Sequence, residues 1–204
     1  NMDKSQTILV HMHLHADNFE FYECLKDKII VGVNMLHLFK LINSIDNDET
    51  LSIYIEEQDY NDGIVEYLNL KFENKNIKQC KIQKLRLIEP EQEELTVPDV
   101  KFSSIINMPS SDFQKIIRDL NNISDKLEIK SINNQLVFKC NGSFANAEII
   151  RSESDGMGFI QKNNSIIQGE FSLKNLNYFI KCTNLCNQIE IYLANDLPLI
   201  VKYN

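Results

Sequence analysis

The chain has 204 residues, of which 43% are apolar and 25% charged, with only 6 Gly and 4 Pro; this length suits one large domain or two of ordinary size, and the composition excludes collagen-like and disordered classes. The formal net charge is −8, so bulk charge alone does not indicate a nucleic-acid-binding protein. Five Cys residues without a CxxC pair favour reduced thiols. No apolar stretch approaches the ~20 residues of a membrane helix, so no membrane partner is expected.

The first elements read as a strand, a short helix and a strand. Apolar residues alternate with histidines over residues 10–15, which predicts a half-buried strand, and Phe19 and Phe21 predict a second strand after a turn. A helix is predicted next, because apolar residues fall at i, i+3, i+4 and i+7, namely Met35, Leu38, Phe39 and Ile42. Alternation over residues 51–55 then predicts another strand.

This unit recurs twice. A second helix is predicted from Phe113 to Leu120, after the capping sequence Pro-Ser-Ser-Asp at 109–112. A third runs from Leu173 to Ile180, and a strand follows each helix at a similar spacing, which indicates an internal repeat. Further short strands are predicted at 68–72, 135–140, 148–150 and 199–203. We therefore expect an α+β fold of antiparallel sheets backed by paired helices. Three helices leave one unpaired, so a fourth unit is expected before residue 1.

An acidic segment separates the first unit from the second. Residues 89–94 read Glu-Pro-Glu-Gln-Glu-Glu, a composition that suits neither a buried strand nor a stable helix. We interpret it as an exposed connector between two similar domains. The expected divisions are a first domain over residues 1–86, a connector over 87–101 and a second domain over 102–204.

Basic residues form a line on each predicted helix. On the second helix, Lys115 and Arg118 lie on a different face from the apolar residues, and Asn122 continues that line. Lys174 and Lys181 stand seven residues apart on the third helix, and Lys40 lies opposite the apolar side of the first. Ordinary solvated helix faces explain this pattern, and so does a surface that contacts phosphates without reading bases. Periodicity does not choose between the two.

Four stretches in the same order resemble the proliferating cell nuclear antigen family, the eukaryotic, archaeal and viral DNA sliding clamps. The longest, at residues 107–125, reads Asn-Met-Pro-Ser-Ser-Asp-Phe-Gln-Lys-Ile-Ile-Arg-Asp-Leu-Asn-Asn-Ile-Ser-Asp, and the others are 32–34, 171–183 and 197–203. The resemblance covers essentially the whole chain, although the family's first strand-helix-strand unit is absent. It implies the DNA clamp fold and a ring of three two-domain subunits whose helices line a hole that holds duplex DNA.

The same resemblance implies a non-enzymatic processivity factor for DNA replication and DNA repair. Its expected partners are duplex DNA, bound without sequence preference, and further copies of the chain in a homotrimer. A DNA polymerase, a clamp loader and other proteins that carry short interacting peptides are also expected. The location implied is the nucleus, or a viral replication compartment. No catalytic residue, cofactor or metal is expected.

Site residues carried over by position fall into three groups. The DNA-facing cations are Lys40, Lys115, Arg118, Lys174 and Lys181, whereas Asn43 and Asn122 stand where the family commonly has a lysine and a histidine. The partner-peptide site is expected at Met2, Gln6, Leu95, Val97, Pro98, Phe102, Leu197 and Pro198. Without the resemblance, Leu95, Val97 and Phe102 would simply pin the connector to a sheet. Subunit contacts are expected between the 75–84 and 147–152 regions, at Lys81, Ile82, Glu148, Ile149 and Ile150.

Two other functions stay open at this stage. One is a clamp-like subunit of a heterotrimeric checkpoint or viral transcription complex, which would keep the fold without self-trimerisation. The other is a metal-binding protein, because His11, His13 and His15 would project from one side of the first predicted strand with Asp17 nearby. Cys182 and Cys186 stand one helical turn apart but are more typical of small packed residues.

Overall fold

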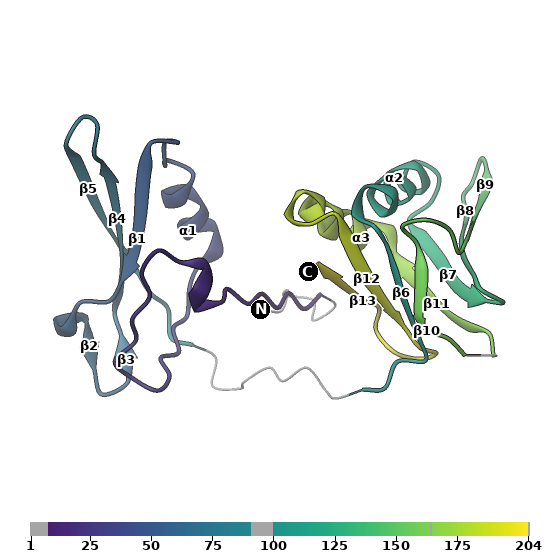
Figure 1. Cartoon of the computed structure of the whole chain (residues 1–204), viewed down its shortest axis with the longest axis horizontal. Coiled ribbons are helices and arrows are strands. Elements are labelled where there is room, and N and C mark those ends of the chain that lie inside the picture. The colour runs from purple at the N-terminus through teal and green to yellow at the C-terminus, as the bar shows by residue number, and fades with distance from the viewer. Residues whose placement is uncertain (1–7, 91–99, 164, 204) are drawn as a thin grey trace. The chain divides into compact units, whose positions relative to one another are not determined.

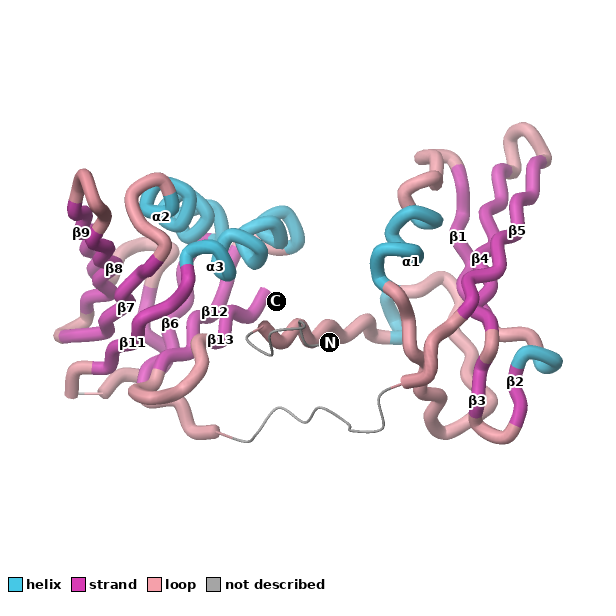
Figure 2. The backbone as a smooth tube through the Cα atoms, turned by 180° about the vertical axis from the view of Figure 1, so that it is seen from behind, coloured by secondary structure: helices cyan, strands magenta, loops and turns pink. Residues whose placement is uncertain are grey.

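The computed structural model describes residues 8–90, 100–163 and 165–203 (Figure 1). Internal contacts divide the chain into two units, one containing residues 9–90 and the other residues 100–203. Both units combine antiparallel sheets with few helices, as the tube in Figure 2 shows. The α+β prediction is therefore confirmed.

The first unit is built on one three-stranded sheet. Its elements are the 3-10 turn η1 (Ala16–Asn18), α1 (Met35–Ile42), β1 (Glu49–Tyr54), the 3-10 turn η2 (Glu57–Asp59), β2 (Tyr60–Asn61), β3 (Ile64–Val65), β4 (Tyr67–Asn74) and β5 (Gln79–Arg86). The sheet has the order β1-β4-β5, and β2 pairs with β3 in a separate ribbon. Leu70 and Phe72 on β4 are fully buried and form its small core together with Val65 and Leu85.

The strands predicted around residues 10–15 and at Phe19–Phe21 are wrong. Neither segment forms a strand, and their apolar side chains are largely exposed: Met12 is 69% exposed, Leu14 64% and Phe21 77%. A strand is stabilised by pairing and by burial of one face, and the described residues supply neither to these segments.

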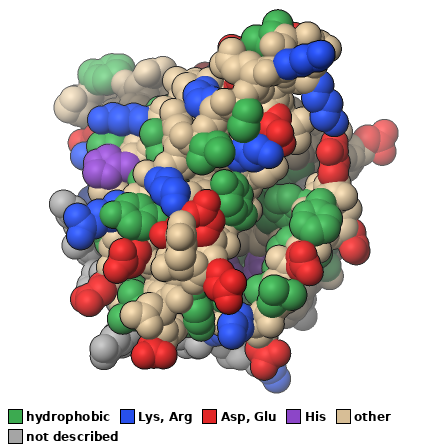
Figure 3. All heavy atoms as spheres, turned by 90° about the vertical axis from the view of Figure 1, so that its left-hand side faces the viewer, with side chains coloured by type: hydrophobic (Ala, Val, Ile, Leu, Met, Phe, Trp, Pro, Cys, Tyr) green, Lys and Arg blue, Asp and Glu red, His purple; other side chains and the backbone are tan. Residues whose placement is uncertain are grey.

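Helix α1 begins where the sequence places it but packs only partly. Asn34 caps it, and the side-chain oxygen of Asn34 accepts hydrogen bonds from the backbone amides of Leu36 and His37 at 3.1 and 3.2 Å. No residue of α1 is buried, and Phe39 on its apolar side is 63% exposed. On the face of the molecule in Figure 3, apolar side chains likewise stand among charged ones.

The second unit contains two four-stranded antiparallel sheets, ordered β10-β6-β12-β13 and β11-β7-β8-β9. Its strands are β6 (Ser104–Pro109), β7 (Lys126–Ile132), β8 (Gln135–Asn141), β9 (Asn146–Ser152), β10 (Gly158–Gln161), β11 (Ile167–Ser172), β12 (Gln188–Leu193) and β13 (Ile200–Tyr203). Its helices are α2 (Ser110–Asn121), α3 (Leu173–Phe179) and the 3-10 helix η3 (Ile180–Leu185).

The core of the second unit lies between these helices and the sheets. Phe113 and Ile117 on α2 are fully buried and join one cluster with Phe138 of β8 and Leu173 of α3. Helices α2 and α3 lie side by side (Figure 1). Polar contacts fix the pair, because the Ser110 hydroxyl donates to a carbonyl at the end of η3 and the Gln114 amide donates to the Ile180 carbonyl, at 2.6 and 2.9 Å.

The units repeat the same local order of a helix, a strand and a hairpin. Helix α1 followed by the β1-β4-β5 sheet corresponds to α2 followed by β7-β8-β9. The rows of paired residues also correspond: Leu51–Phe72–Lys81 across the first sheet matches Ile129–Phe138–Ile149 across the second. The described part of the first unit has no second α-helix beside α1, and this explains why Met35 and Phe39 on the apolar side of α1 are exposed, although Leu38 and Ile42 are half-buried.

Candidate nucleic-acid interface

The predicted cationic lines lie on exposed helix faces. Lys115 and Arg118 are exposed on α2, on the side away from Phe113 and Ile117. Lys40 is exposed in the last turn of α1. Lys174 and Lys181 are both exposed, but they stand on different elements, because α3 ends at Phe179 and the chain continues as the 3-10 helix η3.

These five cations are electrostatically unpaired. Within the described part of the chain, none of Lys40, Lys115, Arg118, Lys174 and Lys181 makes an ion pair. The Lys181 ammonium lies 5.4 Å from the centroid of the Tyr178 ring, an interaction that leaves its charge intact. The charge of these five side chains is therefore not neutralised by an ion pair within the described residues.

Several cations on or beside the strands are instead paired with a carboxylate. They are Lys71, Lys84, Lys126, Lys130, Arg151, Lys162 and Lys202, whose respective partners are Glu73, Glu56, Glu170, Glu128, Asp112, Glu153 and Glu190. Carboxylates thus pair with several of the cations on or beside the strands, whereas the five helix cations make no ion pair among the described residues. The net charge of −8 conceals this division.

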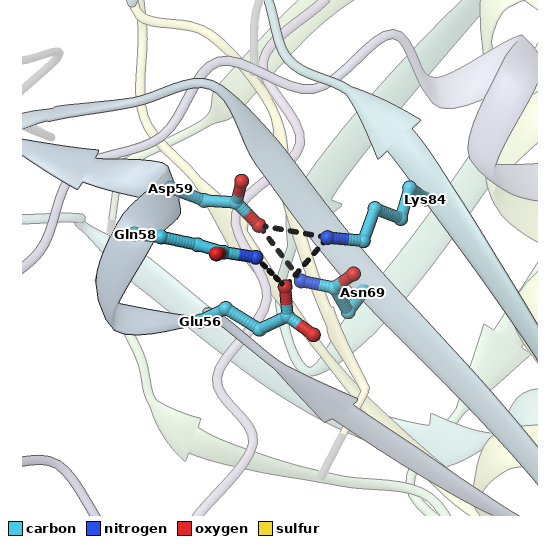
Figure 4. Close-up of polar contacts among 5 residues, drawn as sticks. All are labelled: Glu56, Gln58, Asp59, Asn69 and Lys84. Carbon is cyan, nitrogen blue, oxygen red and sulfur yellow. Dashed lines mark hydrogen bonds and ion pairs between the residues drawn. The ribbon is translucent and has the colours of Figure 1, made fainter.

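The cluster in Figure 4 illustrates the paired class. The Lys84 ammonium contacts Glu56 and lies 3.5 Å from the Asp59 carboxylate, which also accepts a 3.2 Å hydrogen bond from the Asn69 side chain. The hydrogen bond with Lys84 lowers the pKa of Glu56, and the same bond raises the pKa of Lys84. Glu56 is thereby held in its ionised form, so the cluster ties η2 to the sheet and Glu56 offers no proton.

The structure describes only some of the residues predicted to form the partner-peptide site. Met2, Gln6, Leu95, Val97 and Pro98 lie outside the described residues, whereas Leu197 is half-buried and Pro198 exposed.

Phe102 is half-buried and packs edge-on against Tyr192, with ring centroids 5.5 Å apart. Its carbonyl accepts a 2.8 Å hydrogen bond from the Gln161 side chain. Tyr192 is a residue that sequence reasoning missed; the available signal was its outward position in β12, between buried Ile191 and Leu193. Its hydroxyl donates to Glu190 at 2.6 Å, which raises the pKa of Tyr192 to about 12.

The predicted interface residues occupy strands at the ends of their sheets. β5 is outermost in β1-β4-β5, and β9 is outermost in β11-β7-β8-β9, counting described strands only. Ile82 on β5 is 54% exposed and Ile150 on β9 52%. Glu148 is exposed, Ile149 packs against the core of the second unit, and Lys81 is half-buried.

His11, His13 and His15 do not lie on a strand, although the metal-binding alternative placed them on one. The rings of His11 and His13 lie 4.2 Å apart and those of His13 and His15 6.5 Å apart, between centroids. Among the described residues, no group of three or more His, Cys, Asp or Glu side chains is arranged to hold a metal ion. Nor does that part of the chain contain a helix long and apolar enough to cross a membrane.

Comparison with known proteins matches both halves of the chain to one family. Residues 1–94 match the model described as "Proliferating cell nuclear antigen, N-terminal domain", and residues 96–204 match its C-terminal domain. A "Probable DNA polymerase sliding clamp" of Acanthamoeba polyphaga mimivirus is 33% identical over 201 residues, which are 98% of this chain and 42% of that protein. The chain thus spans less than half of this relative.

Two further relatives are covered more fully. "Probable DNA polymerase sliding clamp 1" of Paramecium bursaria Chlorella virus 1 is 32% identical over 99% of this chain and 76% of its own length. "Proliferating cell nuclear antigen" of Chaetomium thermophilum is 31% identical over 100% of this chain and 78% of its own length. The chain therefore belongs to the proliferating cell nuclear antigen family of sliding clamps, whose members are not enzymes.

Proposed function

We propose that this protein is a DNA polymerase sliding clamp that encircles duplex DNA and tethers polymerase and other replication and repair proteins to it. The observation that carries this proposal is the charge pattern of the residues that the structure describes: the cations on α1, α2, α3 and η3 make no ion pair there, whereas several on the sheets are paired with carboxylates. A protein that encircles DNA needs positive side chains toward the phosphates, and these cations supply them although the chain as a whole has a net charge of −8.

The five helix cations would act by binding phosphates. Neutralising backbone phosphates releases counterions and gives affinity that does not depend on base sequence. Separate lysines and arginines on helix faces bind loosely, and such binding lets the duplex slide, whereas a base-reading site would arrest it. A polymerase bound to the clamp then stays at high effective concentration near its template.

Ring closure would join β5 of one copy to β9 of the next. Both strands stand at the ends of their sheets, and pairing them would satisfy backbone donors and acceptors that are otherwise exposed. Ile82 and Ile150, each about half exposed in mid-strand, would be covered in such a pairing. The backbone of Lys81 and the side chains of Glu148 and Ile149 belong to the same two edges. We propose three copies per ring.

Partner proteins would insert a short peptide beside Phe102. The half-buried ring of Phe102, packed on Tyr192, offers an aromatic wall of the kind that receives apolar plugs. Leu197 and Pro198 would contribute to this site, together with the expected positions that lie outside the described residues.

We also propose the domain boundaries, a further unit and a location. The two domains would occupy residues 1–86 and 102–204, with residues 87–101 as their connector. The apolar side of α1, where Met35 is 56% and Phe39 63% exposed, would pack against a further strand-helix-strand unit, as α2 packs against α3. The protein would act where its DNA is copied, in the nucleus or in a viral replication compartment.

The experiment that tests the DNA surface is the salt dependence of duplex binding. Replacing Lys115 and Arg118 together by Ala should reduce the slope of log K against log salt concentration by about one unit for each phosphate that is no longer bound. The matched control is Lys130→Ala, because this cation lies on a strand and is paired with Glu128 at 3.0 Å. An unchanged slope in the double variant would falsify the assignment of α2 to the DNA surface.

A further inference from the structure

The Lys81 side chain ends just beyond the C-terminal end of α1, although Lys81 itself lies on β5. Its ammonium lies 3.2 Å from both the backbone carbonyl and the hydroxyl oxygen of Ser44. Ser44 directly follows Asn43, the C-cap of α1. The C-terminal end of a helix carries partial negative charge, which stabilises a lysine placed there.

The strand register shows that this cation occupies a position that is apolar in the second unit. Lys81 pairs with Phe72, and its counterpart Ile149 pairs with Phe138; both phenylalanines are fully buried. Ile149 packs against the core. The Lys81 ammonium instead lies over the Phe72 ring, 4.4 Å from its centroid, and contacts Ser44 from there. The aliphatic stem of Lys81 covers the apolar row, and the ammonium is held by the ring and by Ser44.

The contact with Ser44 places a positive charge next to α1, which carries Lys40 in its last turn. His37, Lys40 and Ser44 are spaced i, i+3 and i+7, the spacing of one helix face, and Asn43 keeps α-helical backbone angles. Helix α1 is followed by three uncharged residues and then by Asp46, so the Lys81 ammonium supplies a positive charge that this segment itself lacks.

The ammonium retains capacity for a ligand. It carries three N–H donors, and its two hydrogen bonds are both with Ser44. Among the ion pairs of the described residues, none involves Lys81, whereas Lys84, on the same strand, is held by Glu56 and Asp59. Lys81 thus shares the unpaired state of the helix cations although it stands on a strand.

We propose that Lys81 is a further phosphate-binding residue, delivered by β5 to the end of α1 and positioned there by Ser44. The ligand is a backbone phosphate of duplex DNA. This inference rests on the proposed clamp function and adds a phosphate-binding position that the helix pattern alone does not contain. It also gives Lys81 two compatible roles, because edge pairing of β5 uses its backbone and phosphate binding uses its side chain.

The test compares the salt slope of duplex binding for Lys81→Met and Lys81→Arg in the full chain. Methionine keeps an apolar stem over Phe72 but removes the charge, so the slope should fall by about one unit if one bound phosphate is given up. Arginine keeps the charge and should keep the slope. Lys130→Met is the matched control, because it removes a charge that Glu128 already neutralises. If Lys81→Met does not fold, Lys81→Gln makes the same test.

Two results would overturn the proposal. One is an unchanged slope for Lys81→Met while the Lys115/Arg118 double variant lowers it; Lys81 would then only cap α1, and the clamp function would stand. The other is a lower solution mass for Lys81→Met with the slope of the associated form unchanged, which would assign the side chain to the subunit interface. If the double variant also leaves the slope unchanged, the DNA surface itself fails, and Lys81 with it.

Discussion

The role of Phe102 distinguishes two possibilities: a binding site for partner peptides, or a side chain that only packs within the protein. Its ring packs on Tyr192, and its carbonyl accepts a hydrogen bond from Gln161, so the structure holds the ring in place but leaves it half-exposed. If partner peptides dock on this ring, Phe102→Ala should weaken their binding by about 1–4 kcal/mol. Isothermal titration with a polymerase-derived peptide measures the change.

A control variant keeps this result interpretable. Tyr192→Phe retains the ring beside Phe102 and removes only the hydroxyl that donates to Glu190, so the peptide affinity should stay near that of the unchanged protein. Unaltered affinity in Phe102→Ala, together with a lower unfolding temperature, would assign Phe102 to packing alone.

Single residues also show where sequence reasoning stops. The positions of Lys115 and Arg118 are predictable because both lie on one helix, whose 3.6-residue period fixes which side chains share a face. The hydrogen bonds of Lys81 with Ser44 join residues 37 positions apart and depend on strand register. Tyr192 escapes prediction for the same reason, because its neighbour Phe102 lies on another segment of the chain.

At the scale of elements, α1 and α2 have similar apolar spacing but different packing. Phe113 on α2 is fully buried, whereas Phe39 on α1 is 63% exposed. Phe113→Ala should therefore lower the free energy of unfolding by about 3–5 kcal/mol. Phe39→Ala should change it by less than about 0.5 kcal/mol.

Urea unfolding followed by circular dichroism compares the two variants. A decrease for Phe39→Ala as large as that for Phe113→Ala would mean that another surface covers α1 in solution, such as a second copy of the chain. Dilution would then change the midpoint, and this distinguishes association from packing within one chain.

The three helices and the strands that follow them are predictable because each pattern is local. The strands expected near the start of the chain are not predictable in this way. Alternation at residues 10–15 indicates which side chains a strand would bury, but it does not indicate whether a neighbouring strand is available for pairing. The prediction of one continuous third helix is also too simple, because the chain tightens into a 3-10 helix after Phe179. Lys174 and Lys181 are therefore not related by regular helical spacing.

At the scale of the whole molecule, ring assembly makes a direct prediction. Sedimentation equilibrium should give the mass of three 23.7 kDa chains. Ile82→Lys and Ile150→Lys should each shift the equilibrium toward single chains, because a charge would replace an apolar side chain at a proposed interface. Ile160→Lys is a matched control, since Ile160 is 60% exposed on β10 and outside the proposed pairing.

The measured mass also separates the two kinds of clamp. A chain that stays single at high concentration, and is unaffected by either interface variant, would contradict self-assembly. The heterotrimeric alternative would then be tested by adding other clamp-like subunits.

The pairing of sheet cations with carboxylates has a consequence for how a nucleic acid would first meet the protein. An acidic exterior repels polyanions over long range, and this repulsion weakens as salt is added. DNA would then bind mainly at the helices because the rest of the surface repels it. Moderate salt would weaken this repulsion and increase non-specific collisions with the sheets, and it would also slow binding by the helix cations. The surface that never touches DNA would thus decide the direction from which DNA arrives.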